Sequence, residues 1–94
     1  MFEITKTEEG KVKLSGRFDA SQVARAQEVF DTVQGTCVID CSNLEYISSA
    51  GLGILLATYK RLHADGHTLR LQNMRKLVRD VFRYSRMDTI FEVE

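Results

Sequence analysis

The stretch Tyr46-Ile47-Ser48-Ser49-Ala50-Gly51-Leu52-Gly53 carries the most information in this chain. The apolar residues before it are typical of a buried strand, and the spacing after it is typical of an amphipathic helix. Both serines therefore stand where a strand ends and a helix begins. A helix N-terminus leaves about four backbone N–H groups unpaired and carries a partial positive charge. A serine placed there can cap the helix or hold a phosphate, and the small residues beside it would let another protein approach closely.

Upstream of the serines, the sequence predicts a hairpin, a helix and a strand. Residues 2–7 and 11–17 alternate apolar and polar side chains around a Glu-Glu-Gly turn, which is typical of a β-hairpin. Residues 19–33 show helical spacing, with Asp19 or Ser21 available as the cap. Residues 37–39 predict a short buried strand, and we expect a polar turn at residues 40–43.

Downstream, the pattern alternates between helices and short strands. We expect a helix over residues 50–64, with Ile54 on its exposed side and one core stripe formed by Leu52, Leu55, Leu56, Tyr59, Leu62 and His63. A strand at 68–71, a helix at 74–85 and a last strand at 90–93 complete the chain. The apolar side of that last helix is expected to contain Leu77, Val78, Val81 and Phe82.

The resulting order, β-β-α-β-α-β-α-β, predicts an α/β fold with a small mixed sheet of about four to five strands and helices packed on it. The 94 residues are expected to form a single domain, residues 1–94.

Composition narrows the range of functions. The formal net charge is zero, which argues against a nucleic-acid partner. No apolar run approaches the ~20 residues of a membrane span, and the first residues lack the pattern of a signal peptide, so a cytoplasmic location is expected. Cys37 and Cys41 would lie roughly 13 Å apart on a strand, too far for a disulfide. Without further ligands nearby they predict reduced core thiols and no metal site.

Several segments together resemble one family. Residues 14–19 (Leu-Ser-Gly-Arg-Phe-Asp) resemble the ending of one of its strands, and residues 38–44 (Val-Ile-Asp-Cys-Ser-Asn-Leu) resemble another of its strands. Residues 47–53 resemble its phosphorylation loop, and residues 76–82 and 87–91 resemble its tail. Because these segments occur in the family's order over nearly the whole chain, the sequence resembles a stand-alone STAS domain of the bacterial anti-sigma-factor-antagonist kind.

The resemblance implies a phosphorylation-regulated partner switch that is not an enzyme and needs no cofactor. In the family, the unphosphorylated protein binds a serine kinase of the GHKL type that also acts as an anti-sigma factor, phosphorylation releases it, and a PP2C-type phosphatase removes the phosphate. Carried over by position, the acceptor is Ser49, with Ser48 as the second choice because it takes the place of the usual aspartate. The implied partner-binding residues are Asp19, Ser48, Ala50, Gly51, Leu52, Gly53 and Ile54.

Three alternatives stay open at this point. The missing aspartate favours a constitutive STAS scaffold that is never phosphorylated. A serine-nucleophile enzyme would need a base close to Ser49, and neither His63 nor His67 lies in a nucleophile-elbow motif. Finally, residues 60–86 hold eight basic and two acidic side chains, which is typical of a solvated helix face or of a surface for an acidic partner.

Overall fold

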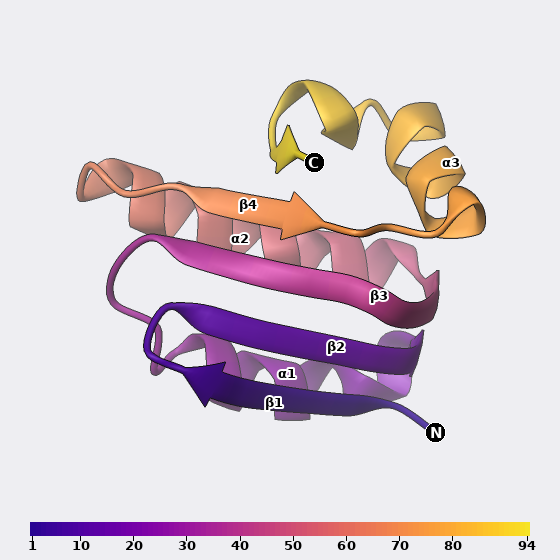
Figure 1. Ribbon diagram of the computed structural model, residues 1–94, viewed down its shortest axis with the longest axis horizontal. Helices are drawn as coiled ribbons and strands as arrows, with labels where there is room; N and C mark the ends of the chain where they lie inside the picture. The colour runs from indigo at the N-terminus through magenta and orange to yellow at the C-terminus, as the bar shows by residue number, and fades with distance from the viewer.

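The computed structural model describes residues 1–94 and contains one five-stranded sheet in the order β1-β2-β3-β4-β5 (Figure 1). Its strands are β1 (Glu3–Glu8), β2 (Lys11–Phe18), β3 (Cys37–Ile47), β4 (Leu69–Gln72) and β5 (Glu92–Val93). The β1–β2 hairpin is antiparallel, whereas β2, β3, β4 and β5 pair in parallel. The mixed α/β sheet expected from the sequence is therefore confirmed.

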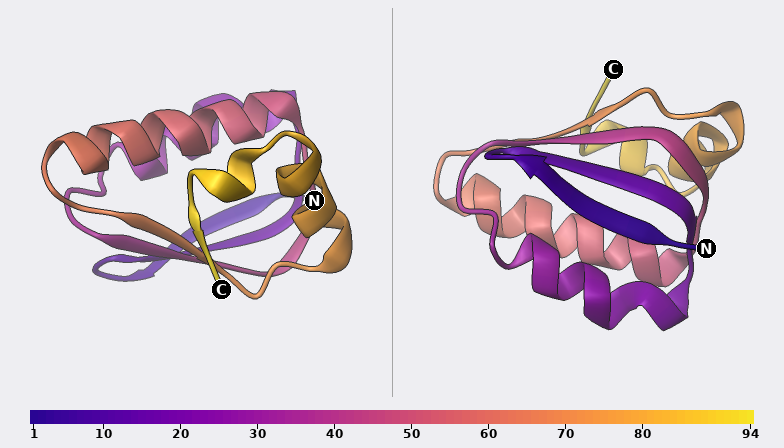
Figure 2. Two further views of the ribbon diagram at one scale, coloured as in Figure 1. Left: turned by 90° about the horizontal axis from the view of Figure 1, so that it is seen from above. Right: turned by 60° about the horizontal axis from the view of Figure 1, so that its bottom comes forward.

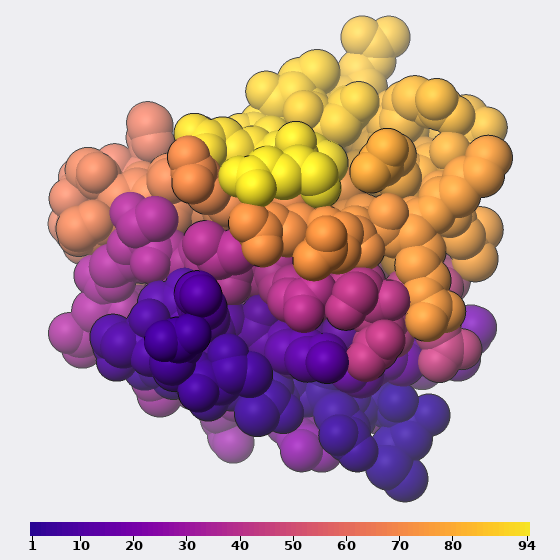
Figure 3. Space-filling view, in the orientation of Figure 1, coloured from indigo at the N-terminus to yellow at the C-terminus, as the bar shows by residue number.

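Three helices connect the parallel strands: α1 (Val23–Phe30), α2 (Ser49–Ala64) and α3 (Lys76–Tyr84). Helices α1 and α2 cover one face of the sheet, and α3 lies at the end of the sheet towards which β3 and β4 run (Figures 1 and 2). Short 3₁₀ turns at Ala20–Gln22 and Met87–Thr89 precede α1 and β5. On the face away from α1 and α2, side chains of successive strands lie side by side without a covering helix (Figure 3). No helix is both long and apolar enough to cross a bilayer.

The core lies between the sheet and the two covering helices. Phe18 of β2 is fully buried, and its ring stacks on Phe2 with 4.7 Å between ring centroids. The C-terminal segment joins the core through Phe91, which packs edge-on against Phe82 of α3 and Tyr59 of α2. The ends of β2, β3 and α2 are thus built on closely packed aromatic and aliphatic side chains, which resist displacement.

The polar turn expected at residues 40–43 is wrong, because β3 runs unbroken from Cys37 to Ile47. The Asp40 carboxylate accepts a hydrogen bond from the Ser42 amide at 3.0 Å, and the pairing with β2 shifts register between Lys13 and Ser15. Such a bulge absorbs an extra residue without ending the strand. Cys41, within the bulge, and Leu44, just after it, remain buried in the core.

Three expectations about helix faces are also wrong. Ile54 is half-buried and packs against the core, because α1 lies against its side of α2. His63 is exposed rather than part of the core stripe, and its ring stacks on Tyr59 at 5.4 Å. Leu77 of α3 is 60% exposed. Val78 and Phe82 already fill the side of α3 that faces the core, and Leu77 points away from it.

Candidate functional site

The site begins where β2 and β3 end side by side. Phe18 and Ile47 are paired residues at the carboxyl ends of these two parallel strands. The Ser48 amide donates a hydrogen bond of 2.9 Å to the Phe18 carbonyl oxygen. Asp19 directly follows Phe18, and Ser48 directly follows Ile47. The two chain segments of the predicted site therefore leave the sheet side by side, at the carboxyl ends of β2 and β3.

Ser48 caps α2. Its backbone is extended, with φ −86° and ψ 169°, and its Oγ accepts a hydrogen bond from the Gly51 amide at 3.1 Å. Aspartate and serine are about equally good at this position, since each offers a side-chain oxygen to the free amides of the first turn. Ser48 therefore supplies the cap that an aspartate would give, and its hydroxyl oxygen is engaged within the chain.

Ser49 is the first residue of α2, and its side chain is exposed. Ser48 accepts from the amides of Gly51 and Leu52, whereas the amides of Ser49 and Ala50 have no partner within the chain. An anion at the Ser49 hydroxyl would lie beside these free N–H groups and the positive end of the helix dipole. The Ser49 position can therefore carry a phosphate without straining the fold.

The residues after Ser49 divide into a buried and an outward-facing group. Gly51 and Leu52 are buried, and a Cβ on Gly51 would lie 2.9 Å from Ile47 Cγ1 and 3.2 Å from the Phe18 ring. Gly51 thus makes room for the chain's own core. Gly53 is exposed, with open space where a Cβ would stand, and Ala50 and Ile54 are half-buried. Ser49, the predicted phosphate acceptor, and Gly53, a predicted partner-binding residue, are the two predicted site residues that are exposed.

Asp19 lies at the same strand ends as Ser48, but its carboxylate forms its hydrogen bonds with Ser21 and not with the serine loop. It accepts hydrogen bonds from the amide and the hydroxyl of Ser21 and so caps the 3₁₀ turn before α1. No hydrogen bond joins it to Ser48 or Ser49. Its contribution to the site is therefore its position at the strand ends, beside the serine loop.

No histidine stands near Ser49. His63 follows it by fourteen residues along α2, which is about 21 Å at the rise of an α-helix. His63 and His67 instead line an open pocket of about 430 Å³ at the other end of α2, together with Tyr59 and Glu92. The cysteines are free, and burial raises the pKa of Cys37 to about 11 and of Cys41 to about 12. Neither thiol is a nucleophile at neutral pH.

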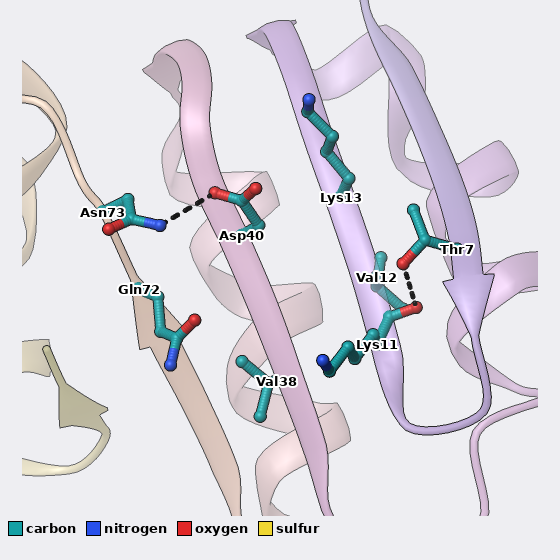
Figure 4. Close-up of a pocket in the computed structure, with 8 residues that line it drawn as sticks. All are labelled: Thr7, Lys11, Val12, Lys13, Val38, Asp40, Gln72 and Asn73. Atoms are coloured by element: carbon teal, nitrogen blue, oxygen red, sulfur yellow. Dashed lines mark hydrogen bonds between the residues drawn. The ribbon is translucent and has the colours of Figure 1, made fainter.

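A second pocket of about 180 Å³ lies on the open face of the sheet (Figure 4). In its wall, Asn73 Nδ2 donates a hydrogen bond to the Asp40 carboxylate at 3.3 Å, a contact that the sequence did not reveal. Outside the pocket, Arg75 Nε donates a hydrogen bond to the Ser42 carbonyl oxygen at 3.0 Å. The hydrogen bonds from the Ser42 amide and from Asn73 help to hold the pKa of Asp40 below its usual value. These contacts tie the segment before α3 to β3. Neither pocket includes a residue of the serine loop.

Replacing Ser48 with alanine is expected to destabilise the protein by about 1 kcal/mol, because the Gly51 amide loses its acceptor. For a domain of this size that lowers Tm by roughly 4–8 °C, which calorimetry measures. Ser48→Asp is the matched control and should be at least as stable as the wild type, since it keeps the acceptor and adds a negative charge at the helix start. Equal stability of the alanine variant would show that the cap contributes nothing.

The fold and this exposed helix start define an α/β domain that presents a serine at a strand–helix junction. The chain belongs to the STAS domain family: the family model described as "Mlab, STAS domain" matches residues 2–92. It is similar to an anti-sigma factor antagonist from Mycobacterium paratuberculosis, with 23% identity, a TM-score of 0.81, and coverage of 99% of this chain and 83% of that chain.

Two structures of SpoIIAA have the same fold. The anti-sigma factor antagonist SpoIIAA in its unphosphorylated form is 22% identical, with a TM-score of 0.78 and coverage of 100% of this chain and 88% of that chain. The Bacillus cell fate determinant SpoIIAA in the phosphorylated form is 20% identical, with a TM-score of 0.70 and coverage of 100% and 91%. The resemblance noted in the sequence is therefore confirmed as a shared STAS fold.

Proposed function

We propose that this chain is a partner-switching protein that binds a serine kinase when Ser49 is unmodified and releases it when Ser49 is phosphorylated. The observation that carries the proposal is the placement of Ser49, exposed at the first position of α2 beside two unpaired amides. A relative of the same fold has been solved in both phosphorylated and unphosphorylated forms, which supports the proposal.

The switch consists of one group transfer and its reversal. The kinase moves the γ-phosphoryl group of ATP to Ser49 Oγ, ADP leaves, and the hydroxyl proton passes to a base of the kinase. Hydrolysis by a phosphatase returns the hydroxyl and inorganic phosphate. The phosphoserine carries about −1.5 to −2 charges. Because the helix start tolerates that charge, its effect falls on the interface with the partner rather than on the fold.

The family resemblance suggests the partners: a kinase of the GHKL type that is also an anti-sigma factor, and a PP2C-type phosphatase. We propose a docking surface formed by Asp19, Ser48, Ala50, Gly51, Leu52, Gly53 and Ile54 around Ser49. Gly51 and Leu52 contribute from beneath, by setting the position of the helix start. The protein acts by binding and is not itself an enzyme. Because the proposed kinase uses ATP, we propose that the binding and release of the partner take place in the cytoplasm.

The proposal is tested by intact-mass spectrometry of the protein purified from its own cells, with peptide mapping across residues 44–60. We expect a phosphate on Ser49. A phosphate on Ser48 would keep the switch and move the acceptor. Absence of phosphate under several growth conditions would contradict the proposal and favour the constitutive scaffold.

A further inference from the structure

Arg17 of β2 is a cation that the chain leaves without an acidic partner. Its side chain is exposed, and its guanidinium carbon lies over the Tyr46 ring, 4.4 Å from the ring centre. None of the ion pairs in the chain involves Arg17. It is also not among the arginines that donate side-chain hydrogen bonds within the chain, which are Arg61, Arg70, Arg75 and Arg83. The N–H groups of Arg17 are therefore free to donate to another molecule.

A bulge decides that Arg17 faces a ring rather than a carboxylate. Gly16 pairs with Leu44 across β2 and β3. If the pairing stayed regular, the next pair along the strands would be Arg17 and Glu45. Instead the register shifts at this point, and Arg17 pairs with Tyr46. Gly16 supports this geometry, because its φ of +83° lies in a region that residues with a Cβ rarely adopt. The backbone thus keeps a nearby carboxylate of the chain out of register with the guanidinium.

Arg17 lies at the border of the proposed docking surface. Side chains alternate along a strand and Phe18 is buried in the core, so Arg17 points to the face of the sheet that α1 and α2 leave uncovered. Asp19 is two residues further on, at the ends of β2 and β3 beside the start of α2 (Figures 1 and 2). A partner that binds the serine loop and reaches round these strand ends would meet the Arg17 guanidinium.

The chemistry of Arg17 and its open setting favour a carboxylate of another protein as the occupant. A guanidinium binds carboxylate or phosphate oxygens with two parallel hydrogen bonds, and stacking on a ring holds it ready to do so. Neither pocket includes Arg17, so a small free anion would meet one cation on an open surface with nothing to enclose it. An aspartate or glutamate side chain carried by a larger interface does not need such an enclosure.

Other anionic partners fit this face of β2 less well. Nucleic acids and anionic membranes are bound by several cations side by side. The other cations on this face have acidic neighbours of their own. Lys11 pairs with Glu8 at 3.2 Å. Lys13 lies opposite Asp40 on β3. The single free guanidinium is therefore suited to one carboxylate rather than to a row of phosphates.

We propose that Arg17 binds an aspartate or glutamate side chain of the same serine kinase, and that Tyr46 is a positioning residue whose ring holds the guanidinium. The docking surface then extends from the serine loop, round the ends of β2 and β3, to the uncovered face of the sheet. Arginine and tyrosine are common among the residues that contribute most to protein interfaces, which agrees with such a contact. This inference rests on the proposed function, because it names a further contact of that partner.

The first test is calorimetric titration of the kinase, which is captured with Ser49→Ala as bait and recognised because it phosphorylates Ser49 of the wild type. Arg17→Gln is expected to weaken binding at least tenfold, since a carboxylate of the kinase would be buried without its partner. Lys13→Gln changes the net charge equally on the same face and should stay within twofold of the wild type. Neither cation forms an ion pair, so both variants should fold normally. Equal binding of the two variants would overturn the inference.

Ser49→Asp, titrated in the same series, separates this inference from the proposed function. If Ser49→Asp releases the kinase while Arg17→Gln binds as the wild type does, the inference about Arg17 is wrong and the proposed function stands. If Ser49→Asp binds as the wild type does, the proposed switch is wrong, whatever Arg17 contacts. If the bait captures no kinase that phosphorylates Ser49, both are wrong.

The role of Tyr46 is tested through its ring. Tyr46→Phe keeps the ring and should bind the kinase within twofold of the wild type, whereas Tyr46→Leu should weaken binding at least threefold. In a chain that already contains Arg17→Gln, Tyr46→Leu should cause no further loss, because the ring acts only through the guanidinium. Weakening by the same factor in both backgrounds would show that Tyr46 does not act through Arg17.

The second test identifies the group that is bound. Arg17→Lys puts a primary amine at this position, and a carbodiimide joins such an amine to a carboxylate in direct contact with it. At concentrations that saturate the kinase, we expect a cross-linked peptide between residue 17 and an aspartate or glutamate of the kinase. The wild type is the control, because a guanidinium does not form this amide. A complex with no cross-link at residue 17 would overturn the inference.

Discussion

Replacing Ser49 with aspartate is expected to weaken binding of the partner kinase on the order of a hundredfold, the equivalent of about 3 kcal/mol. The physical reason is the new carboxylate at the centre of the docking surface, which must lose its water and face whatever acidic groups the partner places there. The Ser49 hydroxyl makes no hydrogen bond within the chain, so the loss of binding arises in the complex and not in the free protein.

The effects of this substitution on stability and on binding should have opposite signs. A negative charge at the first position of α2 interacts favourably with the helix dipole, by about 0.3–1 kcal/mol. Ser49→Asp should therefore be as stable as the wild type or slightly more stable while it loses the partner. A merely structural role for Ser49 would not produce that combination.

The measurement is calorimetric titration of the kinase captured with Ser49→Ala as bait. Ser49→Ala should bind as the wild type does. Ser49→Asn is the matched control, because it has the size of aspartate without the charge and should bind much more tightly than Ser49→Asp. If Asp and Asn weaken binding equally, bulk rather than charge controls the interface; if the aspartate and alanine variants bind alike, the switch mechanism is wrong.

The order of elements and the place of the serines could be predicted because both depend on local patterns. Alternation in residues 2–17 and helical spacing after Ala50 follow from which side chains are apolar. The serine junction needs only a buried strand before it and an amphipathic helix after it. A hairpin followed by three helical crossovers allows few sheet topologies, because crossovers are right-handed and consecutive strands are usually neighbours. The observed order β1-β2-β3-β4-β5 is one of them.

What the sequence did not reveal depends on contacts between distant residues. Asp40 and Ser42 are typical turn residues, and only the bulge opposite β2 and the bond from Asn73 show how β3 continues through them. Whether Ile54 is exposed depends on where α1 packs.

Gly51 shows most clearly how a contact between distant residues decides the role of a position. Its neighbours along the chain suggest open space for a partner, but the Phe18 ring, thirty-three residues earlier, occupies that space. By contrast, nothing lies within 4 Å of the Cβ position of Gly53. Two glycines in one helical turn thus have different physical roles, and only the position of Phe18 distinguishes them.

Replacing Gly51 with valine is therefore expected to destabilise the protein by about 3 kcal/mol, the upper part of the usual range for overpacking. The Cβ alone would lie 2.9 Å from Ile47 Cγ1 and 3.2 Å from the Phe18 carbonyl oxygen, and two methyl groups follow it. Since Phe18 accepts the bond from the Ser48 amide, its displacement would also loosen the junction that holds the serines. Tm should fall by roughly 12–24 °C.

The matched control is Gly53→Val, in the same helix, on its exposed side. Valine has a slightly higher helix propensity than glycine, so this change should leave the free energy of unfolding within about 0.5 kcal/mol of the wild type. Urea denaturation of both variants gives the comparison. Similar stabilities would mean that the contact between Phe18 and α2 is looser than the structure has it. If Gly53→Val folds normally but fails to bind the kinase, then Gly53 provides space for the partner, as Gly51 provides it for the core.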